Sequence, residues 1–416
     1  MNNSFANKKL TFLTDHINEI ITEYNDSDST AARIRNGFFL KRKYLGSKDR
    51  KCITGVFYFY FRHYGFASSH SIPELLFLSY NFDPNVSKAL DKLIKHIDIS
   101  EYISELYNLD NSILDRFDSI SSTSFFPPTF IDNINISSDE LEDLCESLNK
   151  EATTDIRAIR NRAAIEEDLM SLSATYFTNI VPDCLKIKGN VNLDSTATYR
   201  NGDFEIQDEG SQLISYALSP NKGETILDYC SGGGGKSLHL AQLSDDSARI
   251  IATDISNNRL NETKRRVAKL GLKSISVREI EEVKKSDLKY DKIIIDAPCT
   301  GSGTVRRAPD IRVRIDAKSI EFYHSLQLEI LDEVADKLKP GGLLVYSTCS
   351  LFERENDETI ANFLSLHTDF TILSTVDVLE SQNLDTTRFS KTKHGLQTFT
   401  HKTQMDSFYI STLKKI

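Results

Sequence analysis

Short apolar segments that end in polar or reactive side chains recur from about residue 201 onward, and they constrain the fold more than any other feature. The segments 225–230, 250–255, 292–298 and 343–349 are of this kind, and helical stretches such as 257–270 and 319–338 separate them. Near-continuous apolar strands with intervening helices are typical of a mostly parallel, doubly wound α/β sheet. The pattern predicts such a sheet for the second half of the chain.

The reactive residues of these segments stand at one end of each predicted strand. Cys230, Asp254, Asp296 with Cys299, and Cys349 all lie at or just beyond a strand's carboxyl end. A free cysteine is usually a small buried hydrophobe. Ligands of doubly wound sheets, however, bind beyond the carboxyl ends of the strands. This shared placement predicts a functional site that includes Cys349.

A glycine-rich loop, "DYCSGGGGKSLHLA" (228–241), follows the first of these strands. Consecutive glycines allow a close backbone approach to a ligand, and the following helix N-terminus offers N–H groups. A P-loop would require glycine at Cys230, and a dinucleotide fingerprint would require its third glycine at Ser237. Asp254 stands 19 residues after Gly235, close to the spacing of an acid that binds ribose hydroxyls. These features favour a nucleoside ligand such as S-adenosylmethionine, with nucleotide phosphates as the alternative.

The first 200 residues have a different character. Helical spacing of apolar residues predicts helices over 10–24, 51–65 and 83–97, and the Ser- and Pro-rich stretch 119–130 indicates a linker. A strand over 155–162, a helix over 163–172 and a strand over 184–193 follow. We therefore predict three domains, at 1–130, 131–200 and 201–416. A chain of this length is expected to hold two to three domains, since domains typically have roughly 150 residues.

The composition indicates an ordinary globular protein, with 39% hydrophobic and 26% charged residues. No apolar run approaches the ~18 residues of a membrane span, and the start lacks the apolar region of a signal peptide. Six cysteines without a CxxC pair suggest reduced thiols in the cytoplasm and no metal site. The formal charge of −10 argues against a uniformly cationic nucleic-acid coat but allows local basic patches.

Three motifs carry a resemblance to a known family. They are "DYCSGGGGKS", "IIIDAPCTGSGTVRRAPDIRVR" (293–314) and "GGLLVYSTCSLFERENDETI" (341–360). They resemble motifs of the NOL1/NOP2/Sun family of RNA cytosine-5 methyltransferases, and within it the bacterial small-subunit rRNA methyltransferase B group. The similarity extends to 202–218 and 405–413, and in the first half a weaker similarity reaches 155–162 and 45–51. The resemblance implies a class I, Rossmann-like S-adenosylmethionine-dependent core over 201–416. It further implies an N-terminal all-α, NusB-like RNA-binding domain and a small α/β RNA-binding subdomain.

The chemistry of this family explains why these residue types are needed. C5 of cytosine is a weak nucleophile, and a thiolate that adds to C6 turns the ring into an enamine-like nucleophile at C5. The resemblance implies that Cys349 is this nucleophile and that Cys299 assists release of the product. Asp296 would hydrogen-bond the base, and Lys236 would lower a thiolate pKa or orient Asp296.

The resemblance also implies binding residues. Those expected at the cofactor are Cys230, Ser231, Gly232, Gly233, Gly234, Gly235, Lys236, Asp254, Arg259, Glu281 and Asp296, with Glu279 and Glu282 as alternatives to Glu281. Those expected at the RNA are Arg157, Arg160, Arg162, Arg306, Arg307, Arg312 and Arg314. The implied partner is RNA, ribosomal RNA before transfer RNA, and we expect a monomer without membrane or metal.

The sequence differs from the family's motifs at two places, and other interpretations of its function remain open. The family's Ala-Ala-Pro is replaced by Ser231-Gly232-Gly233, and its terminal Asp-Gly-Phe-Phe by 406–409, "DSFY". DNA cytosine-5 methyltransferases use the cysteine of a Pro-Cys motif, which Cys299 superficially fits, but they need no second cysteine. A non-catalytic RNA-binding assembly factor is the alternative outside enzymes, and retention of all four catalytic residues argues against it.

Overall fold

The computed structural model describes residues 3–95, 97–189 and 191–416. The chain divides into two compact units, which we name the helical unit and the sheet unit. The helical unit comprises Met1–Asp132, Ile136–Lys150 and Val305–Ile315, and the sheet unit comprises Asn133–Asn135, Glu151–Thr304 and Asp316–Ile416. His96 and Asn190, which fall in the predicted helix 83–97 and strand 184–193, lie outside the described residues. The three predicted domain boundaries remain predictions.

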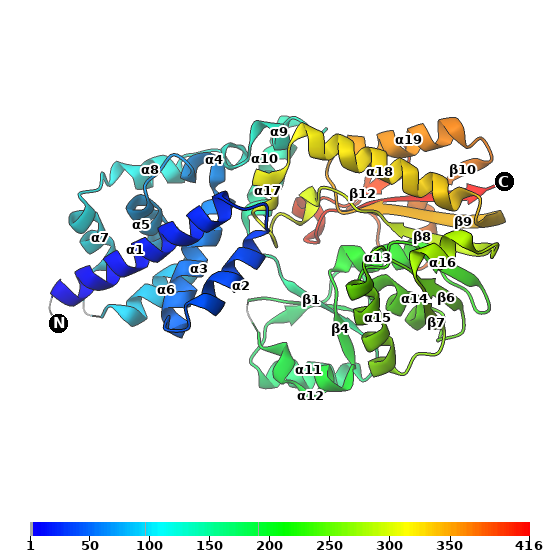
Figure 1. The fold of residues 1–416 in the computed structure, drawn as a ribbon, viewed down its shortest axis with the longest axis horizontal. Helices are drawn as coiled ribbons and strands as arrows, with labels where there is room; N and C mark the ends of the chain where they lie inside the picture. Colours follow the sequence, from blue (N-terminus) through cyan, green and yellow to red (C-terminus); the bar gives the residue numbers. More distant parts are fainter. Residues whose placement is uncertain (1–2, 96, 190) are drawn as a thin grey trace. The chain divides into compact units, whose positions relative to one another are not determined.

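Helices build the helical unit (Figure 1). They are α1 Asn3–Asn25, α2 Ala31–Lys41, α3 Ser47–Arg62, α4 Tyr64–Ala67, α5 Ile72–Phe82, α6 Pro84–Leu93, α7 Ile99–Tyr107, α8 Ser112–Asp118, the 3-10 helix η1 Ser122–Phe125, α9 Pro128–Ile131, α10 Ser138–Asn149 and α17 Ile311–Arg314. In α1 the side chains of Leu10, Leu13, Ile17 and Ile20 are fully buried. The apolar spacing predicted for this segment therefore marks the face that packs into the core.

The stretch 119–130 differs from its expectation as a linker. It forms η1 and the start of α9, and the rings of Phe125, Phe126 and Phe130 are buried. Burial of these three large aromatic side chains holds the segment within the core of the helical unit. The sequence pattern showed the Ser and Pro residues but not this packing.

A small antiparallel sheet opens the sheet unit, with strand order β2-β3-β1-β4. Its elements are β1 Thr154–Ala158, α11 Arg162–Ser171, β2 Tyr176–Phe177, β3 Cys184–Ile187, η2 Leu193–Ser195, α12 Ala197–Asn201 and β4 Phe204–Ile206. Ile156 and Leu185 of the strands pack with Ile165 and Leu169 of α11 in a core of their own. The predicted order of strand, helix and strand is present, but β1 ends at Ala158 and β3 at Ile187, short of the predicted ends at 162 and 193.

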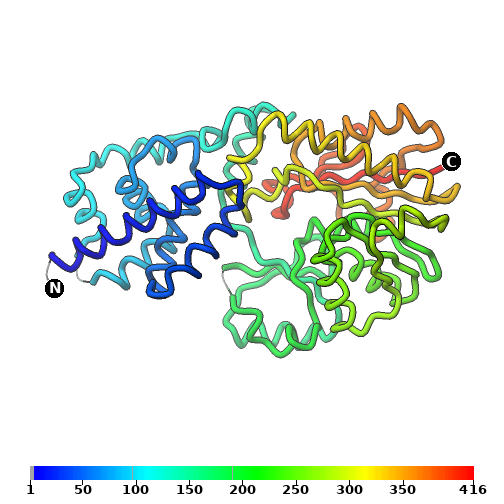
Figure 2. Tube along the Cα trace, in the orientation of Figure 1, coloured from blue at the N-terminus to red at the C-terminus, as the bar shows by residue number. Residues whose placement is uncertain are grey.

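The large sheet follows in the order β11-β12-β13-β9-β8-β5-β6-β7, and β10 also pairs with β13. Its strands are β5 Thr225–Asp228, β6 Arg249–Ala252, β7 Ile275–Val277, β8 Tyr290–Asp296, β9 Leu338–Thr348, β10 Phe370–Leu373, β11 Ser390–Lys391, β12 Leu396–Gln397 and β13 Tyr409–Lys415. Strands β5 to β9 pair in parallel, whereas β13 runs antiparallel to β9 and β10. Figure 2 traces β13, in red, back beside β9.

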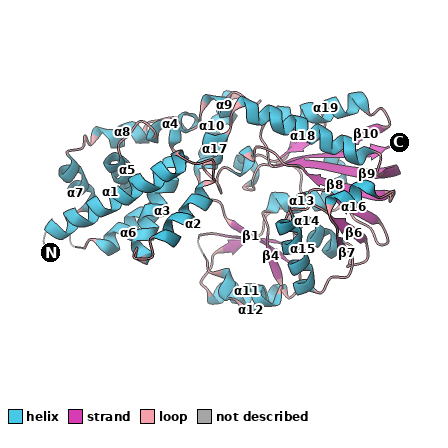
Figure 3. Ribbon diagram, in the orientation of Figure 1, coloured by secondary structure: helices cyan, strands magenta, loops and turns pink. Residues whose placement is uncertain are grey.

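Helices cover both faces of this sheet (Figure 3). They are α13 Glu209–Leu218, α14 Gly235–Leu243, α15 Asn257–Leu270, α16 Ile280–Lys285, η3 Ser302–Thr304, α18 Ala317–Ala335, η4 Glu353–Glu355, α19 Asp357–Leu366, α20 Thr375–Ser381 and α21 Thr400–Thr403. Alternate strand residues point to opposite faces. Ile226 and Ile294 therefore meet α13, α14 and α20, whereas Leu227 and Ile293 meet α16, α18 and α19. The predicted doubly wound α/β class is confirmed.

Candidate functional site

The predicted site residues gather at one edge of the large sheet. Strand β5 pairs with β6 and β8 through Asp228, and Asp296 of β8 pairs with Ser347 of β9. Because these strands are parallel, their carboxyl ends share an edge. At this edge, just beyond the strand ends, lie the glycine loop 230–235, Asp254, Cys299 and Cys349.

The glycine loop depends on glycine at particular positions. Gly232 and Gly234 have φ of +55° and +82°, which other residues adopt only with strain. A Cβ at Gly234 would lie 2.6 Å from Cγ2 of Thr263 in α15. The loop therefore needs Gly234 both for its backbone conformation and for its close approach to α15.

Asp254 holds the glycine loop in place. Its carboxylate accepts hydrogen bonds from the backbone N–H of Gly232 at 2.9 Å and of Ser256 at 2.8 Å. Arg259 lies 3.8 Å from the same carboxylate, with its side chain 67% exposed. Asp254 is thus placed at the loop, as predicted for a cofactor residue, although the bonds seen here are to the backbone.

Buried polar atoms without partners surround this loop. Among the described residues, nothing hydrogen-bonds Oγ of Ser231, Oγ1 of Thr253 or Oδ1 of Asp228. Burial raises the pKa of Asp228 to about 7, although Ser237 donates a hydrogen bond to its other oxygen at 2.5 Å. Buried polar groups are normally satisfied, so these atoms fit a polar ligand such as a nucleoside at the loop.

Lys236 and Asp296 form an ion pair at the strand ends. Nζ of Lys236, in the first turn of α14, lies 2.6 Å from Oδ2 of Asp296 and 2.9 Å from Oγ of Ser211. Ser347 donates a hydrogen bond to Oδ1 of Asp296 at 3.3 Å. The sequence placed both residues at this edge, and the structure brings their charged groups into contact.

Cys299 and Cys349 meet with their sulfur atoms 3.3 Å apart. Both are free thiols and half-buried. The hydrogen bond to Cys349 and burial raise the pKa of the Cys299 thiol well above its usual range. Cys299 therefore stays protonated and can donate a hydrogen bond to the sulfur of Cys349. This geometry places two thiols at one point, as a two-cysteine mechanism requires.

Glu355 is a site residue that the sequence analysis missed. Its fully buried carboxylate accepts hydrogen bonds from the Thr300 backbone N–H at 2.8 Å, the Thr300 hydroxyl at 2.6 Å and the Ser350 hydroxyl at 2.5 Å. Burial raises the pKa of Glu355, and these bonds oppose the rise. One carboxylate thus ties the residue after Cys299 to the residue after Cys349. An acidic residue six positions after Cys349 was the only available sequence signal.

Asn356 adds two hydrogen bonds beside those of Glu355. It accepts a hydrogen bond from the Thr348 hydroxyl at 2.6 Å and donates one to the Ser350 carbonyl at 3.0 Å. Both neighbours of Cys349 are therefore fixed by the segment 353–356. The acidic stretch after the cysteine motif serves the site rather than forming only a solvated helix face.

The other predicted cofactor residues lie at the same edge with different exposure. Burial, with help from Asp228 and Asp296, raises the pKa of the Cys230 thiol well above its usual range, which suits packing rather than chemistry. Glu281 and Glu282 lie in the first turn of α16, and Glu279 is its N-cap residue. All three glutamates are exposed, and the structure does not distinguish among them.

The arginines predicted near the small sheet do not share one role. The Arg157 side chain is fully buried and donates hydrogen bonds to Gln207, at 2.7 Å, and to Gln242, and burial lowers its pKa to about 10. The predicted RNA contact by Arg157 is therefore wrong for this conformation. Arg160 pairs with Asp203 at 2.8 Å and Arg162 with Glu166 at 3.0 Å, and both side chains retain exposed surface.

The second arginine group belongs to the helical unit. Arg312 is fully buried, stacks over the Phe126 ring at 3.9 Å and donates to Asn149 at 2.8 Å. Burial lowers its pKa to about 9. Because the side chain has no exposed surface that RNA could reach, its predicted RNA contact is also wrong. Arg306 is buried, whereas Arg307 and Arg314 are exposed, and Arg314 lies 3.6 Å from Asp310.

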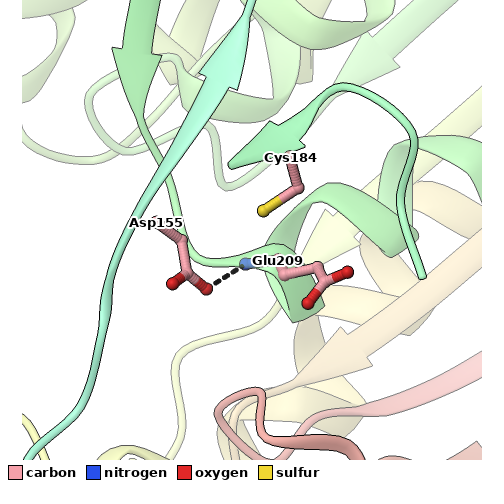
Figure 4. A group of neighbouring side chains, drawn as sticks. All are labelled: Asp155, Cys184 and Glu209. Atoms are coloured by element: carbon pink, nitrogen blue, oxygen red, sulfur yellow. Dashed lines mark hydrogen bonds between the residues drawn. The ribbon is translucent and has the colours of Figure 1, made fainter. Parts of the chain in front are cut away.

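A buried ionic centre lies apart from this site, between the small sheet and α13. Asp155, Cys184 and Glu209 meet there with the ligand types of a metal site (Figure 4). Nζ of Lys186, however, lies 2.6 Å from Asp155 and 3.3 Å from Glu209. The lysine ammonium supplies the positive charge that these carboxylates need, so the group is a structural ion-pair centre.

The parallel strands β7-β6-β5-β8-β9, the antiparallel β13 and the glycine loop after β5 define a Rossmann-like methyltransferase fold. Residues 215–414 match the family model described as 16S rRNA methyltransferase RsmB/F. Over this region, just under half of the chain, the protein is similar to the RsmB/F family.

Curated relatives are similar to this chain in sequence, and solved structures are similar to it in fold. The probable ribosomal RNA small subunit methyltransferase B of Bacillus subtilis is 34% identical over 243 residues, 57% of this chain and 53% of that protein. The chain spans about half the length of the curated relatives it matches. In fold, it is similar to PH0851, with TM-score 0.73 and 23% identity over 97% of this chain and 98% of that one. It is also similar to NSun6 from Pyrococcus horikoshii, with TM-score 0.60 and 19% identity over 70% and 98%.

Proposed function

We propose that the protein is an S-adenosylmethionine-dependent RNA cytosine-5 methyltransferase, with small-subunit ribosomal RNA as its substrate. The observation that carries the proposal is the contact of the Cys299 and Cys349 sulfurs beside the Lys236–Asp296 ion pair. A Rossmann-like methyltransferase needs no second thiol for simple methyl transfer. A pair of thiols is what covalent activation and later release of a pyrimidine ring require.

The roles of the chain's own groups follow from their positions. The Cys349 thiolate adds to C6, forming an S–C6 bond, and the C5=C6 electron pair becomes available at C5. Asp296, held by Lys236 and Ser347, hydrogen-bonds the base and favours protonation at N3. Once C5 carries the methyl group, a base takes the C5 proton, and the C–H electron pair re-forms the C5=C6 bond. The S–C6 bond then breaks with its electron pair on the Cys349 sulfur. Cys299 carries a proton next to the departing sulfur and assists this release.

The cofactor fits the edge formed by the glycine loop. S-adenosylmethionine, when bound, would supply the methyl group. Gly232 to Gly235, Asp254 and the unpartnered hydroxyls of Ser231 and Thr253 would hold it. Calorimetry should detect S-adenosylmethionine binding and no ATP binding. ATP binding alone would favour the nucleotide-phosphate alternative.

Replacing Asp254 with alanine is expected to weaken S-adenosylmethionine binding by about 10- to 100-fold. The variant loses a charged acceptor, and hydrogen bonds to charged groups contribute about 1.5–3 kcal/mol each. The Gly232 anchor is lost as well. Calorimetry measures the change, and Asp245→Asn, at an exposed carboxylate, is the matched control. Equal affinities for the two variants would contradict the cofactor role of Asp254.

Glu355→Ala is expected to lower kcat by about 100-fold while the affinity for S-adenosylmethionine stays unchanged. The substitution frees the loops that carry the two cysteines, and misplacement by about 1 Å can cost that much. Glu355→Gln keeps an acceptor for the Thr300 N–H and should recover part of kcat. A fall in cofactor affinity that parallels kcat, without recovery by glutamine, would indicate general unfolding instead.

Bisulfite sequencing of total RNA from a deletion strain tests the substrate. We expect one cytosine of small-subunit ribosomal RNA to lose its methyl group, and it should regain it when the gene is restored. Loss at a transfer RNA position instead would replace the ribosomal substrate. No loss at any cytosine would contradict the proposed reaction.

A further inference from the structure

The Lys236 ammonium has two acceptors, and they come from different elements of the sheet unit. Nζ of Lys236 lies 2.6 Å from Oδ2 of Asp296, on β8, and 2.9 Å from Oγ of Ser211. Ser211 stands in the first turn of α13, the helix that packs beside α14 (Figure 1). Ser211 thus contacts the ion pair from a separate helix.

The second acceptor matters because a lysine side chain is flexible. Its ammonium ends a long carbon stem and carries donors that can rotate toward any acceptor. Asp296 alone would fix the length of the ion pair but not its direction. The Lys236 side chain is only 10% exposed, so water has little access to replace a lost acceptor. Ser211 therefore determines where the ammonium lies relative to Asp296.

A chain of side chains from the small sheet holds Ser211 in turn. Nε2 of Gln207 lies 3.4 Å from Oγ of Ser211, and Nε of Arg157, on β1, donates to Oε1 of Gln207 at 2.7 Å. Arg157 also donates to Gln242 of α14, whose amide donates to the Ala158 carbonyl at 3.0 Å. Side-chain hydrogen bonds therefore connect β1 with the ion pair without a break.

Packing alone does not account for the burial of Arg157. The side chain is fully buried, and its hydrogen bonds go to two glutamine side chains. Nη2 has no hydrogen-bond partner among the residues that the structure describes. Burying a cation away from a paired carboxylate costs free energy. Fixing Gln207 is a task for this cation that an apolar side chain could not perform.

We propose that Ser211 is a positioning residue that holds the Lys236 ammonium against Asp296, and that Arg157 and Gln207 hold Ser211. Ser211 acts through Lys236 rather than on the base. When the thiolate adds to C6, Asp296 has to meet the base at a defined point, and misplacement by about 1 Å can cost about 100-fold in rate. The inference rests on the proposed function, because it concerns the same site.

Variants of the full-length protein test Ser211. Methyl transfer from radiolabelled S-adenosylmethionine to a small-subunit ribosomal RNA transcript gives kcat and KM. Ser211→Ala should lower kcat by about 10- to 100-fold and leave the KM for RNA within about twofold, because the ion pair is misplaced while the RNA contacts remain. Ser211→Thr keeps a hydroxyl at the same position and should restore kcat to within about threefold.

Ser215→Ala is the matched control. It removes a buried hydroxyl one turn further along α13, and this hydroxyl has no hydrogen-bond partner within the described part of the chain. The substitution should leave kcat unchanged, because it does not touch the ion pair.

The covalent step gives a second readout. In the Cys299→Ala protein, adding Ser211→Ala should slow the formation of the protein–RNA adduct by at least about tenfold, because Asp296 acts on the base as the thiolate adds. Calorimetry measures S-adenosylmethionine binding by the same variants, which should stay unchanged. A parallel loss of cofactor affinity would show a general structural defect and would overturn the positioning role.

Gln207→Met tests the chain behind Ser211. It keeps the length of the side chain and removes its hydrogen bonds, so kcat should fall several-fold in the otherwise wild-type protein. In the Ser211→Ala protein the same substitution should change kcat by less than about twofold, because residues that act through one another give non-additive losses. Equal fold losses in both proteins would overturn the roles of Gln207 and Arg157.

Equal kcat values for Ser211→Ala and Ser215→Ala would overturn the proposal. So would failure of Ser211→Thr to recover the activity that Ser211→Ala loses. Mass spectrometry of the nucleosides identifies the product of the wild-type protein. If that product is a methylated nucleoside other than 5-methylcytidine, the proposed function fails, and the comparison of Ser211→Ala with Ser215→Ala still decides this inference. A wild-type protein that methylates no RNA would overturn both.

Discussion

Cys349→Ala is expected to abolish methyl transfer to RNA, with a loss of at least about a thousandfold, whereas Cys299→Ala should stall after it. Removal of a covalent nucleophile costs several orders of magnitude because the difficult step is no longer divided. Without Cys299, the Cys349–C6 bond forms but is released slowly. Incubation of Cys299→Ala with RNA and S-adenosylmethionine should then yield a protein–RNA adduct that migrates slowly on a denaturing gel.

The double variant separates the roles of the two thiols. Cys299→Ala/Cys349→Ala should give no adduct, because the attacking sulfur is gone. Cys145→Ala, which removes a buried thiol of the helical unit, is the control for loss of a cysteine and should turn over normally. An adduct with Cys349→Ala would reverse the assignment and favour the Pro-Cys chemistry of DNA cytosine-5 methyltransferases. Full turnover by Cys349→Ala would exclude Cys349 as the nucleophile.

The sheet edge and the catalytic contacts were predictable because they follow from local patterns. Strands β5, β6, β8 and β9 are short apolar runs, and parallel pairing brings their carboxyl ends together. That rule alone places Lys236, Asp296 and Cys349 near one another. The Lys236–Asp296 ion pair and the contact between the two cysteine sulfurs then form because these side chains extend from backbone positions that the strand pattern predicts.

Other features depend on contacts that no local pattern contains. Glu355 meets Thr300 across 55 residues, and Arg312 fills a space between Phe126 and Asn149. An arginine on a surface and an arginine stacked in a core have the same sequence signal. Val305–Ile315 joins the helical unit although it lies inside the second half of the chain. These outcomes are set by packing between distant segments.

The buried ionic centre near α13 is another feature that packing between distant segments determines. Asp155, Lys186 and Glu209 are fully buried, and they come from β1, β3 and the first turn of α13. Burial alone would lower the pKa of Lys186, but Asp155, Asp208 and Glu209 together raise it. Glu209 also accepts hydrogen bonds from the Ile180 and Val181 backbone N–H groups. The lysine thus joins the small sheet to the helix that begins the Rossmann-like core.

Lys186→Met is therefore expected to destabilise the sheet unit by about 3–5 kcal/mol, because it leaves two carboxylates buried without a cation. Chemical denaturation of the full-length protein, followed by far-UV circular dichroism, measures the shift of the sheet-unit transition. Lys188→Met is the matched control, since Lys188 is exposed two residues further along, and it should change stability by less than about 0.5 kcal/mol. Adding Asp155→Asn to Lys186→Met removes one of the two buried carboxylate charges and should restore part of the loss. Equal midpoints for Lys186→Met and Lys188→Met would show that the ammonium does not hold this centre together.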